Sequence, residues 1–231
     1  MGKADLHMHT CHSDGRATVR ELLDAVRNRT DLDVIAITDH DTLSGADEAR
    51  EMASDYPFEI VAGEEISTLN GHLIGLFLEE PVQPKMTIEE TVREVHVQGG
   101  LAYIPHPFFW NGYFSRHYTS IYELGVRLID ACVDGIEVVT QTPALRWANN
   151  QARRFADDIG CLAQLAGSGT HDCHGIGRAY TLFPGGTAAD LRAAIVGGYT
   201  HAVAHEWSLA DLLTNAGWYT RLPAGEPEIS A

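Results

Sequence analysis

Histidine and acidic side chains recur in this sequence at the points where short apolar runs end. His7 and His9 close the run that begins at residue 4, and His40 directly follows the run 34–38. Other histidine and acidic residues lie at the end of an apolar run, in the loop after one, or at the turn that opens one. They are Asp14, Glu65, His72, His106, Asp172 and His174. Imidazole and carboxylate groups without thiolates are ligands that suit zinc, manganese and iron. Carboxylates placed close together are costly to keep ionised without cations between them, so we expect divalent metal ions.

The elements that must position these side chains alternate between strands and helices. Apolar runs predict strands at 4–8, 34–38, 59–67, 72–78, 101–105, 135–140, 162–166 and 180–183. Helical spacing of apolar residues predicts helices at 18–29, 43–54, 87–98, 149–159 and 188–196. Asn70-Gly71 indicates a hairpin turn between the third and fourth strands. Buried strands alternating with helices favour a mostly parallel sheet, either a barrel or an open doubly wound fold, whose carboxyl strand ends meet on one face.

Length and composition limit the class of protein. The 231 residues, 45% of them hydrophobic, predict a single α/β domain over 1–231 with a frayed tail after about Pro223. A net charge of −16 disfavours nucleic acid as a partner. No apolar stretch reaches the length of a membrane span, and the N-terminus does not read as a signal peptide. The four cysteines form no CxxC pair, which favours a reducing cytoplasm, and the oligomeric state is left open.

Six short segments resemble the ordered motifs of the PHP (polymerase and histidinol phosphatase) superfamily. The four principal ones are HMHTCHSDG at 7–15, TDHD at 38–41, IPHP at 104–107 and GTHDCHG at 169–175. GEEIS at 63–67 is similar to the segment that carries the family's metal-bridging glutamate, and GHLIG at 71–75 to the histidine segment after it. The resemblance runs from residue 5 to about 200, with all motifs in order.

This resemblance implies a distorted (β/α)7 TIM-like barrel with a trinuclear metal centre at its carboxyl mouth. One metal would be held by His7, His9, Glu65 and Asp172. A second would share Glu65 and add His72 and His106, and the third would take Asp14, His40 and His174. The family spacing after Gly63 selects Glu65 rather than Glu64 as the ligand.

The activity implied is that of a metal-dependent phosphoesterase, a hydrolase that cleaves a small phosphorylated metabolite or nucleotide through a metal-bound hydroxide. Asp39 or His171 would assist protonation of the leaving group. Arg178 would bind phosphate oxygens, because a guanidinium group matches phosphate geometry; Arg116 and Arg146 are weaker candidates for the same role. The alternative is hydrolysis of a carboxylic or carbamic ester on the same centre. A non-catalytic binding module is disfavoured, because no ligand of the set is missing.

Some histidines and aromatic residues stand apart from this set. His12 is expected either to contact substrate or to be exposed, and the aromatic residues at 108–114 either to stack on a ring or to pack on the barrel rim. We expect structural or exposed roles for His96, His201 and His205.

Overall fold

A curved sheet forms the centre of the protein. The computed structural model describes residues 1–108, 121–140 and 146–205. The strands of this part are β1 (Gly2–Asp5), β2 (Val34–Ile37), β3 (Glu59–Thr68), β4 (Gly71–Leu76), β5 (Leu101–Ile104), β6 (Gly135–Thr140), β7 (Ala163–Gly167), β8 (Ala179–Phe183) and β9 (His201–Ala204). They lie in the order β7-β6-β5-β4-β3-β2-β1-β8-β9.

The sheet curls until β7, the first strand in this order, nearly meets β8, the eighth. It therefore forms an almost closed barrel. Across the seam between β7 and β8, the buried Thr181 hydroxyl donates to the carbonyl of Ala166 at 2.9 Å and accepts from its N–H at 2.8 Å. Beyond the end of β1, Met8 pairs in parallel with Thr170, and the N–H of Gly169 donates to the carbonyl of His7 at 2.8 Å. These contacts replace a complete ladder, so the predicted distorted barrel is confirmed.

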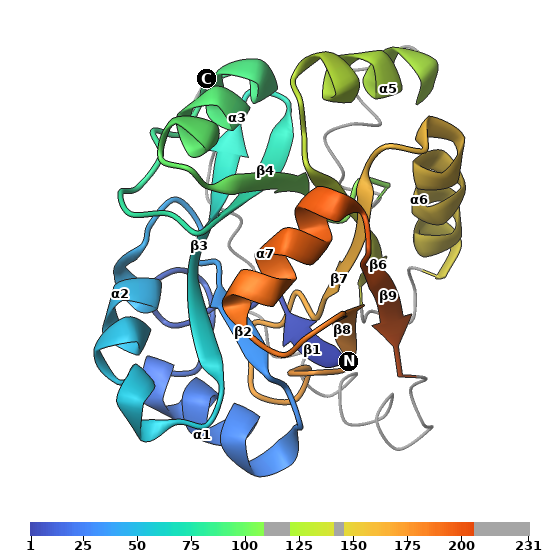
Figure 1. Cartoon of the computed structure of the whole chain (residues 1–231). Coiled ribbons are helices and arrows are strands. Elements are labelled where there is room, and N and C mark those ends of the chain that lie inside the picture. Colours follow the sequence, from blue (N-terminus) through green and yellow to red (C-terminus); the bar gives the residue numbers. More distant parts are fainter. Residues whose placement is uncertain (109–120, 141–145, 206–231) are drawn as a thin grey trace.

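Helices cover the barrel from outside and close one end of it. They are α1 (Val19–Arg29), α2 (Ser44–Glu51), α3 (Ile88–Val97), α5 (Ile121–Asp130), α6 (Arg146–Ile159) and α7 (Ala188–Gly197), with a 3-10 turn, η1, at Ala53–Asp55. In Figure 1, α7 lies across the sheet while the other helices stand around it. Leu191, Ala194 and Ile195 of α7 pack against interior residues of the strands, such as Ala4 and Phe183. Helix α7 therefore plugs the barrel with apolar side chains at the end where the parallel strands begin.

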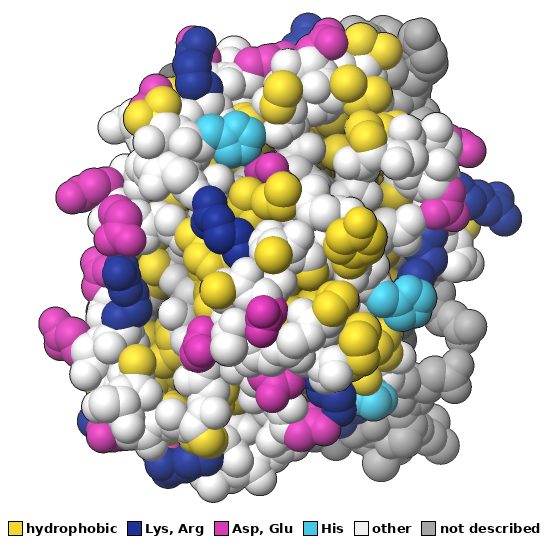
Figure 2. Space-filling view, in the orientation of Figure 1, with side chains coloured by type: hydrophobic (Ala, Val, Ile, Leu, Met, Phe, Trp, Pro, Cys, Tyr) yellow, Lys and Arg dark blue, Asp and Glu magenta, His cyan; other side chains and the backbone are white. Residues whose placement is uncertain are grey.

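Hydrophobic side chains also reach the surface on the face that carries α7 (Figure 2). Val196, at the end of α7, is 68% exposed, and Tyr199 is 72% exposed. None of the described helices is long and apolar enough to cross a lipid bilayer.

Most of the predicted elements agree with this architecture. Thr87 and Glu90 form the expected capping box of α3. The hairpin at Asn70-Gly71 is present, with Thr68 opposite Gly71. Helix α5 and strand β9 were not predicted. Among the described strands four of the eight neighbouring pairs are antiparallel, whereas a mostly parallel sheet was predicted. The tail after Pro223 lies outside the described residues.

Candidate metal centre

One buried carboxylate, Glu65, lies at the centre of the polar cluster, and its side chain is 1% exposed. Its Oε2 atom lies 3.0 Å from His7 Nε2, 3.1 Å from His9 Nε2 and 3.7 Å from His40 Nδ1. Its Oε1 atom lies 2.7 Å from His72 Nδ1 and 3.0 Å from His106 Nε2. Five imidazoles therefore surround one carboxylate.

The strand ends explain why these residues meet. His7 and His9 follow β1, and His106 follows β5, so all three lie at the carboxyl ends of parallel strands. His40 forms a parallel bridge with Glu65 beyond the end of β2. His72 lies near the start of β4, but β4 runs antiparallel to β3, so this start lies at the same end of the barrel.

The electrostatics of the cluster depend on this mutual contact. Burial alone would raise the pKa of Glu65, but the charges of His7 and His72 and hydrogen bonds from His106 and His7 hold it well below its usual value. Burial opposes protonation of His7, yet Glu65 and Glu137 raise the pKa of His7 well above its usual value. His9 has fewer compensating contacts, and burial lowers its pKa to about 4.

A second group of ligand atoms lies on the outer side of His9, around Asp14. Asp14 Oδ2 lies 3.1 Å from His171 Nε2, and Asp14 Oδ1 lies 3.8 Å from His40 Nε2 and 3.9 Å from His9 Nδ1. Partial burial would raise the pKa of Asp14, but the hydrogen bond and charge of His171, with the charges of His40 and His9, lower it to about 2.

These donors fit divalent metal ions. Three groups of potential ligand atoms, each within 4.8 Å of one another, occur among the described residues: His9, Asp14, His40 and His171; His7, Glu65 and His106; and His40, Glu65 and His72. The Nδ1 atom of His9 is buried without a hydrogen-bond partner, as a nitrogen held ready for a cation would be. His40 belongs to two groups, but a neutral imidazole offers a single lone pair. The two groups that contain His40 therefore cannot both use it at once, which agrees with two or three metals.

Comparison with known proteins identifies the family to which this chain belongs. The family model of the PHP domain matches residues 5–151, and the model of the PHP-associated region matches residues 146–200. The chain belongs to the PHP domain family. It is thereby placed among the PHP-family metal-dependent phosphoesterases.

Individual relatives agree with this assignment. An uncharacterized protein of Methanocaldococcus jannaschii is 37% identical over 148 residues, 59% of this chain and 80% of that protein. A 3′,5′-nucleoside bisphosphate phosphatase of Chromobacterium violaceum is 33% identical over 90 residues, 37% of this chain and 31% of that enzyme. The crystal structure of a two-domain Bacteroides vulgatus protein, which contains a predicted PHP-like metal-dependent phosphoesterase, is similar to this one. The two sequences are 25% identical. The two structures superpose with a TM-score of 0.73 over 92% of this chain and 68% of that one.

Two expected ligands of the PHP domain, Asp172 and His174, lie outside all three groups. Asp172 Oδ1 accepts the backbone N–H of His174 at 2.7 Å, and the Thr170 hydroxyl donates to the carbonyl of Asp172 at 2.6 Å. His174 Nδ1 lies 3.7 Å from the same carboxylate oxygen. These contacts hold the turn 170–174 together, and a metal role for the two residues stays a prediction.

The residues proposed to act beside the metals are placed as follows. Asp39 is fully buried, and its carboxylate accepts hydrogen bonds from the N–H and hydroxyl of Thr10, each at 2.7 Å, and from the Ser13 hydroxyl at 2.6 Å. This geometry favours a role in holding the loop before Asp14. The Nε–H of Arg178 donates to the carbonyl of His174 at 3.3 Å, so its guanidinium lies against the last motif.

Glu137 is a functional candidate that the sequence reasoning missed. It lies in β6, its side chain is fully buried, and its Oε1 atom lies 3.2 Å from His7 Nδ1. Its Oε2 atom accepts the backbone N–H of His106 at 2.8 Å, where His106 has a φ of 29°. A glutamate within the apolar run 135–140 was the available signal. Glu137 holds His7 and His106 in place from behind.

The choice between Glu64 and Glu65 is also visible in the geometry. Glu65 contacts the imidazoles, whereas Glu64 Oε2 accepts the N–H of Val82 at 2.8 Å. Burial raises the pKa of Glu64 to about 7. Glu64 therefore fastens the loop after β4 and belongs to none of the three groups.

The remaining histidines and the weaker candidates lie elsewhere. His12 Nε2 lies 2.6 Å from Glu48 Oε2, and His96 Nε2 lies 2.8 Å from Asp134 Oδ2. His201 and His205 are exposed, as expected. Arg116 and the aromatic residues 109–114 lie outside the described residues, as does the side chain of Arg146.

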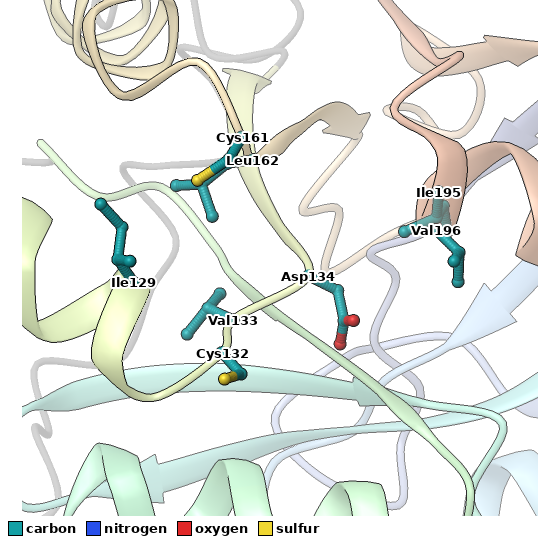
Figure 3. Close-up of a pocket in the computed structure, with 8 residues that line it drawn as sticks. All are labelled: Ile129, Cys132, Val133, Asp134, Cys161, Leu162, Ile195 and Val196. Carbon is teal, nitrogen blue, oxygen red and sulfur yellow. The ribbon is translucent and has the colours of Figure 1, made fainter.

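A hollow of about 260 Å³ lies away from this cluster (Figure 3). Val133 and Asp134 line it just before β6, and Cys161 and Leu162 just before β7. These are the amino ends of parallel strands, opposite the end that carries Glu65. The hollow is therefore separate from the metal centre.

Proposed function

We propose that this PHP domain hydrolyses a phosphate ester of a small metabolite or nucleotide, with two or three manganese, zinc or iron ions at the barrel mouth. The observation that carries the proposal is the contact of five imidazoles with the single buried carboxylate of Glu65. Such a carboxylate can bridge two cations, and its histidines supply the neutral nitrogen ligands that zinc, manganese and iron accept.

When bound, the metals supply a hydroxide nucleophile at neutral pH and positive charge for the phosphoryl oxygens. The protein's part is to hold the ligands and to orient them. A hydrogen bond from His7 Nδ1 to Glu137 leaves the lone pair on Nε2, which is the atom that faces Glu65. Arg178 lies against the carbonyl of His174. It is our candidate for binding the phosphate oxygens that the metals do not contact. Asp39 is a poor proton donor to the leaving group, because its oxygens already accept three hydrogen bonds. Water is the better candidate, and His171 can serve only where its nitrogen does not bind a metal.

Net charge, rather than similarity to relatives, supports a small phosphate ester over a long nucleic acid. The 3′,5′-nucleoside bisphosphate phosphatase of C. violaceum matches 37% of the chain, but a 5′-3′ exoribonuclease of Haemophilus influenzae matches the same share at 38% identity. The net charge of −16 repels an extended polyanion, whereas a small phosphate ester can be neutralised locally by metals and one arginine.

A substrate screen tests the proposal. Protein purified without chelator and supplemented with manganese is assayed on nucleotides, nucleoside bisphosphates, sugar phosphates, and aryl phosphate mono- and diesters. Aryl carboxylic esters and a 5′-phosphorylated oligonucleotide are the contrasting substrates. We expect a phosphate ester to be hydrolysed fastest. Faster cleavage of a carboxylic ester than of any phosphate ester would overturn the proposal and favour carbonyl chemistry on the same centre.

Glu65→Gln is the matched variant for this screen, because it keeps the side chain's size and removes its charge from among the five imidazoles. Loss of this ligand should lower the hydrolysis rate by more than the roughly 10–100-fold that is typical when a hydrogen-bond partner of a metal ligand is removed. The exposed residue His201 provides the control, and His201→Gln should retain wild-type rates. Equal activity of the two variants would show that the hydrolysis does not depend on this cluster.

A further inference from the structure

The carboxylate of Asp5 is fully buried at the end of β1 and belongs to none of the three ligand groups. Its Oδ1 atom accepts the backbone N–H of Ser168 at 2.8 Å and, in a weaker hydrogen bond, that of His7 at 3.4 Å. Its Oδ2 atom accepts the N–H of Gly177 at 2.9 Å. One side chain thus joins the segment that carries His7, the turn after β7 and the turn before β8.

These segments meet at the seam of the barrel. In Figure 1, β1, β7 and β8 lie together, and each contacts the other two. Ser168 directly follows β7, and Gly177 lies two residues before β8. Because β8 runs antiparallel to β1, its start lies beside the end of β1. Asp5 therefore bridges both sides of the seam at the end of the barrel that carries the metal cluster.

Gly177 directly precedes Arg178, and the turn that contains both is held from several sides. The N–H of Arg178 donates to the carbonyl of Gly175 at 3.1 Å, and its own carbonyl accepts the N–H of His205 at 2.7 Å. Gly177 has a φ of 70°, a region that favours glycine, and a Cβ atom there would lie 3.0 Å from Thr30 Cγ2. These contacts fix the turn locally, whereas the hydrogen bond to Asp5 ties it to the strand that leads to His7.

Closure of the seam alone does not explain a carboxylate at this position. Further along the same seam, the hydroxyl group of Thr181 joins β8 to β7 without any charge. A buried carboxylate is costly unless its oxygens are hydrogen-bonded, so it needs the N–H groups that it accepts here. In return it offers two acceptor oxygens in a fixed geometry and no donor. Asp5 therefore sets the place of the Gly177 N–H relative to those of Ser168 and His7.

We infer that Asp5 is a positioning residue that holds Arg178 in place relative to His7 and the cluster around Glu65. The inference rests on the proposed function, in which Arg178 binds phosphate oxygens. Asp5 acts through the backbone N–H of Gly177 and not through the substrate, because its oxygens face N–H groups of the chain. Loss of the Oδ2 hydrogen bond should shift the guanidinium and leave the metal ligands where they are.

Asp5→Asn tests this with little change in size. Its amide keeps one acceptor oxygen, and its NH₂ group must face an N–H. The orientation that keeps both hydrogen bonds of Oδ1 places the NH₂ against Gly177. Asp33→Asn is the matched control, because Asp33 Oδ2 accepts the N–H of Lys3 at 2.9 Å near the opposite end of β1. Circular dichroism and metal analysis show whether each variant is folded and loaded.

The decisive experiment is a double-mutant cycle between Asp5→Asn and Arg178→Ala. Calorimetry measures the binding of inorganic phosphate to the manganese-loaded proteins, and kcat/KM is measured on the best phosphate ester. We expect each single variant to bind phosphate on the order of tenfold more weakly with unchanged metal content. The double variant should stay within about twofold of Arg178→Ala, and Asp33→Asn should bind like wild type.

Additive effects, roughly a hundredfold loss in the double variant, would show that Asp5 does not act through Arg178 and would overturn the inference. So would loss of metal from Asp5→Asn, phosphate binding at the wild-type level in that variant, or a wild type that binds no phosphate.

Gly177→Ala keeps the inference testable if Asp5→Asn does not fold. The added methyl group strains the same turn and leaves Asp5 intact. It should weaken phosphate binding in the wild type but not in Arg178→Ala, and an equal effect in both would again overturn the inference. Coupling in phosphate binding without hydrolysis of any ester would remove the proposed function and keep this inference. Hydrolysis with additive effects would do the reverse.

Discussion

Gly45, the second residue of α2, is where one added methyl group should damage the site most clearly. A Cβ atom there would lie 2.1 Å from Asp39 Oδ2 and 2.7 Å from Thr10 Oγ1. These two oxygens are hydrogen-bonded at 2.7 Å, and Asp39 Oδ1 also accepts the N–H of Thr10 and the Ser13 hydroxyl. Gly45→Ala must therefore displace the Asp39 carboxylate and loosen the loop that carries Asp14.

The expected change in the free energy of unfolding of Gly45→Ala is the sum of a stabilising and a destabilising contribution. In an open helix, alanine would stabilise the protein by about 0.5–1 kcal/mol relative to glycine. Overpacking costs about 1–3 kcal/mol, and each hydrogen bond to a charged group that is lost costs about 1.5–3 kcal/mol. We expect a net loss of roughly 2–4 kcal/mol in the free energy of unfolding.

Urea denaturation of metal-free protein, followed by circular dichroism, measures this loss, and Mn²⁺ titration of the folded variant measures the effect on the ligand group around Asp14. Gly186→Ala is the control, because a Cβ atom there meets nothing within 4 Å; it should change stability by less than about 0.5 kcal/mol. If Gly45→Ala were as stable as wild type and bound Mn²⁺ equally well, Asp39 would not hold this loop in the way we argue.

Two further predictions concern residues that act beside the ligands. Glu137→Gln should bind Mn²⁺ about 10–100-fold more weakly while staying folded. His7 and the N–H of His106 each face a different oxygen of Glu137, so the amide NH₂ of glutamine would face one of these two donors. Calorimetry checks this against Glu48→Gln at an exposed carboxylate, and equal affinities would contradict a positioning role. Arg178→Ala should lower kcat/KM for a phosphate ester by on the order of tenfold or more with unchanged metal content, since a charge-assisted hydrogen bond contributes about 1.5–3 kcal/mol. The exposed Arg50→Ala is its control, and equal kinetics of the two variants would remove Arg178 from phosphate binding.

Much of the fold could be predicted from the spacing of apolar residues, because most of its strands and helices bury one continuous run or one helical face. The differences arise where local signals are weak. Strand β9 has four residues and, among the described strands, pairs only with β8, so its sequence hardly differs from a loop. Strand β1 ends at Asp5 rather than at residue 8. Beyond it, Met8 forms an isolated parallel bridge with Thr170, and its carbonyl accepts the N–H of Thr38, just after β2, at 2.9 Å. Such pairing on both sides depends on tertiary contacts.

The candidate site was predictable in position and less so in detail. Strand ends indicated that His7, His9, His40, Glu65 and His106 would meet, and the structure brings them together. His72 also joins them, although it lies at the start of a strand. Its place follows from strand direction: β4 returns antiparallel, so its first residues reach the same end as the last residues of β3. The hairpin turn was therefore the feature that made His72 a ligand candidate.

Glu137 and His171 show what spacing cannot decide. Glu137 reads as an irregularity in an apolar strand, and its meaning depends on His7 lying opposite it across the barrel interior. Gly167 of β7 permits this approach, since a Cβ atom there would lie 2.4 Å from His7 Cβ and 3.1 Å from Glu137 Oε1. Motif order likewise assigns His174 as the last ligand, whereas pairing of Met8 with Thr170 places His171 beside His9. Which residues can reach a metal thus depends on how far the pairing between Met8 and Thr170 extends along the chain. Because that pairing joins residues about 160 positions apart, only the folded structure shows it.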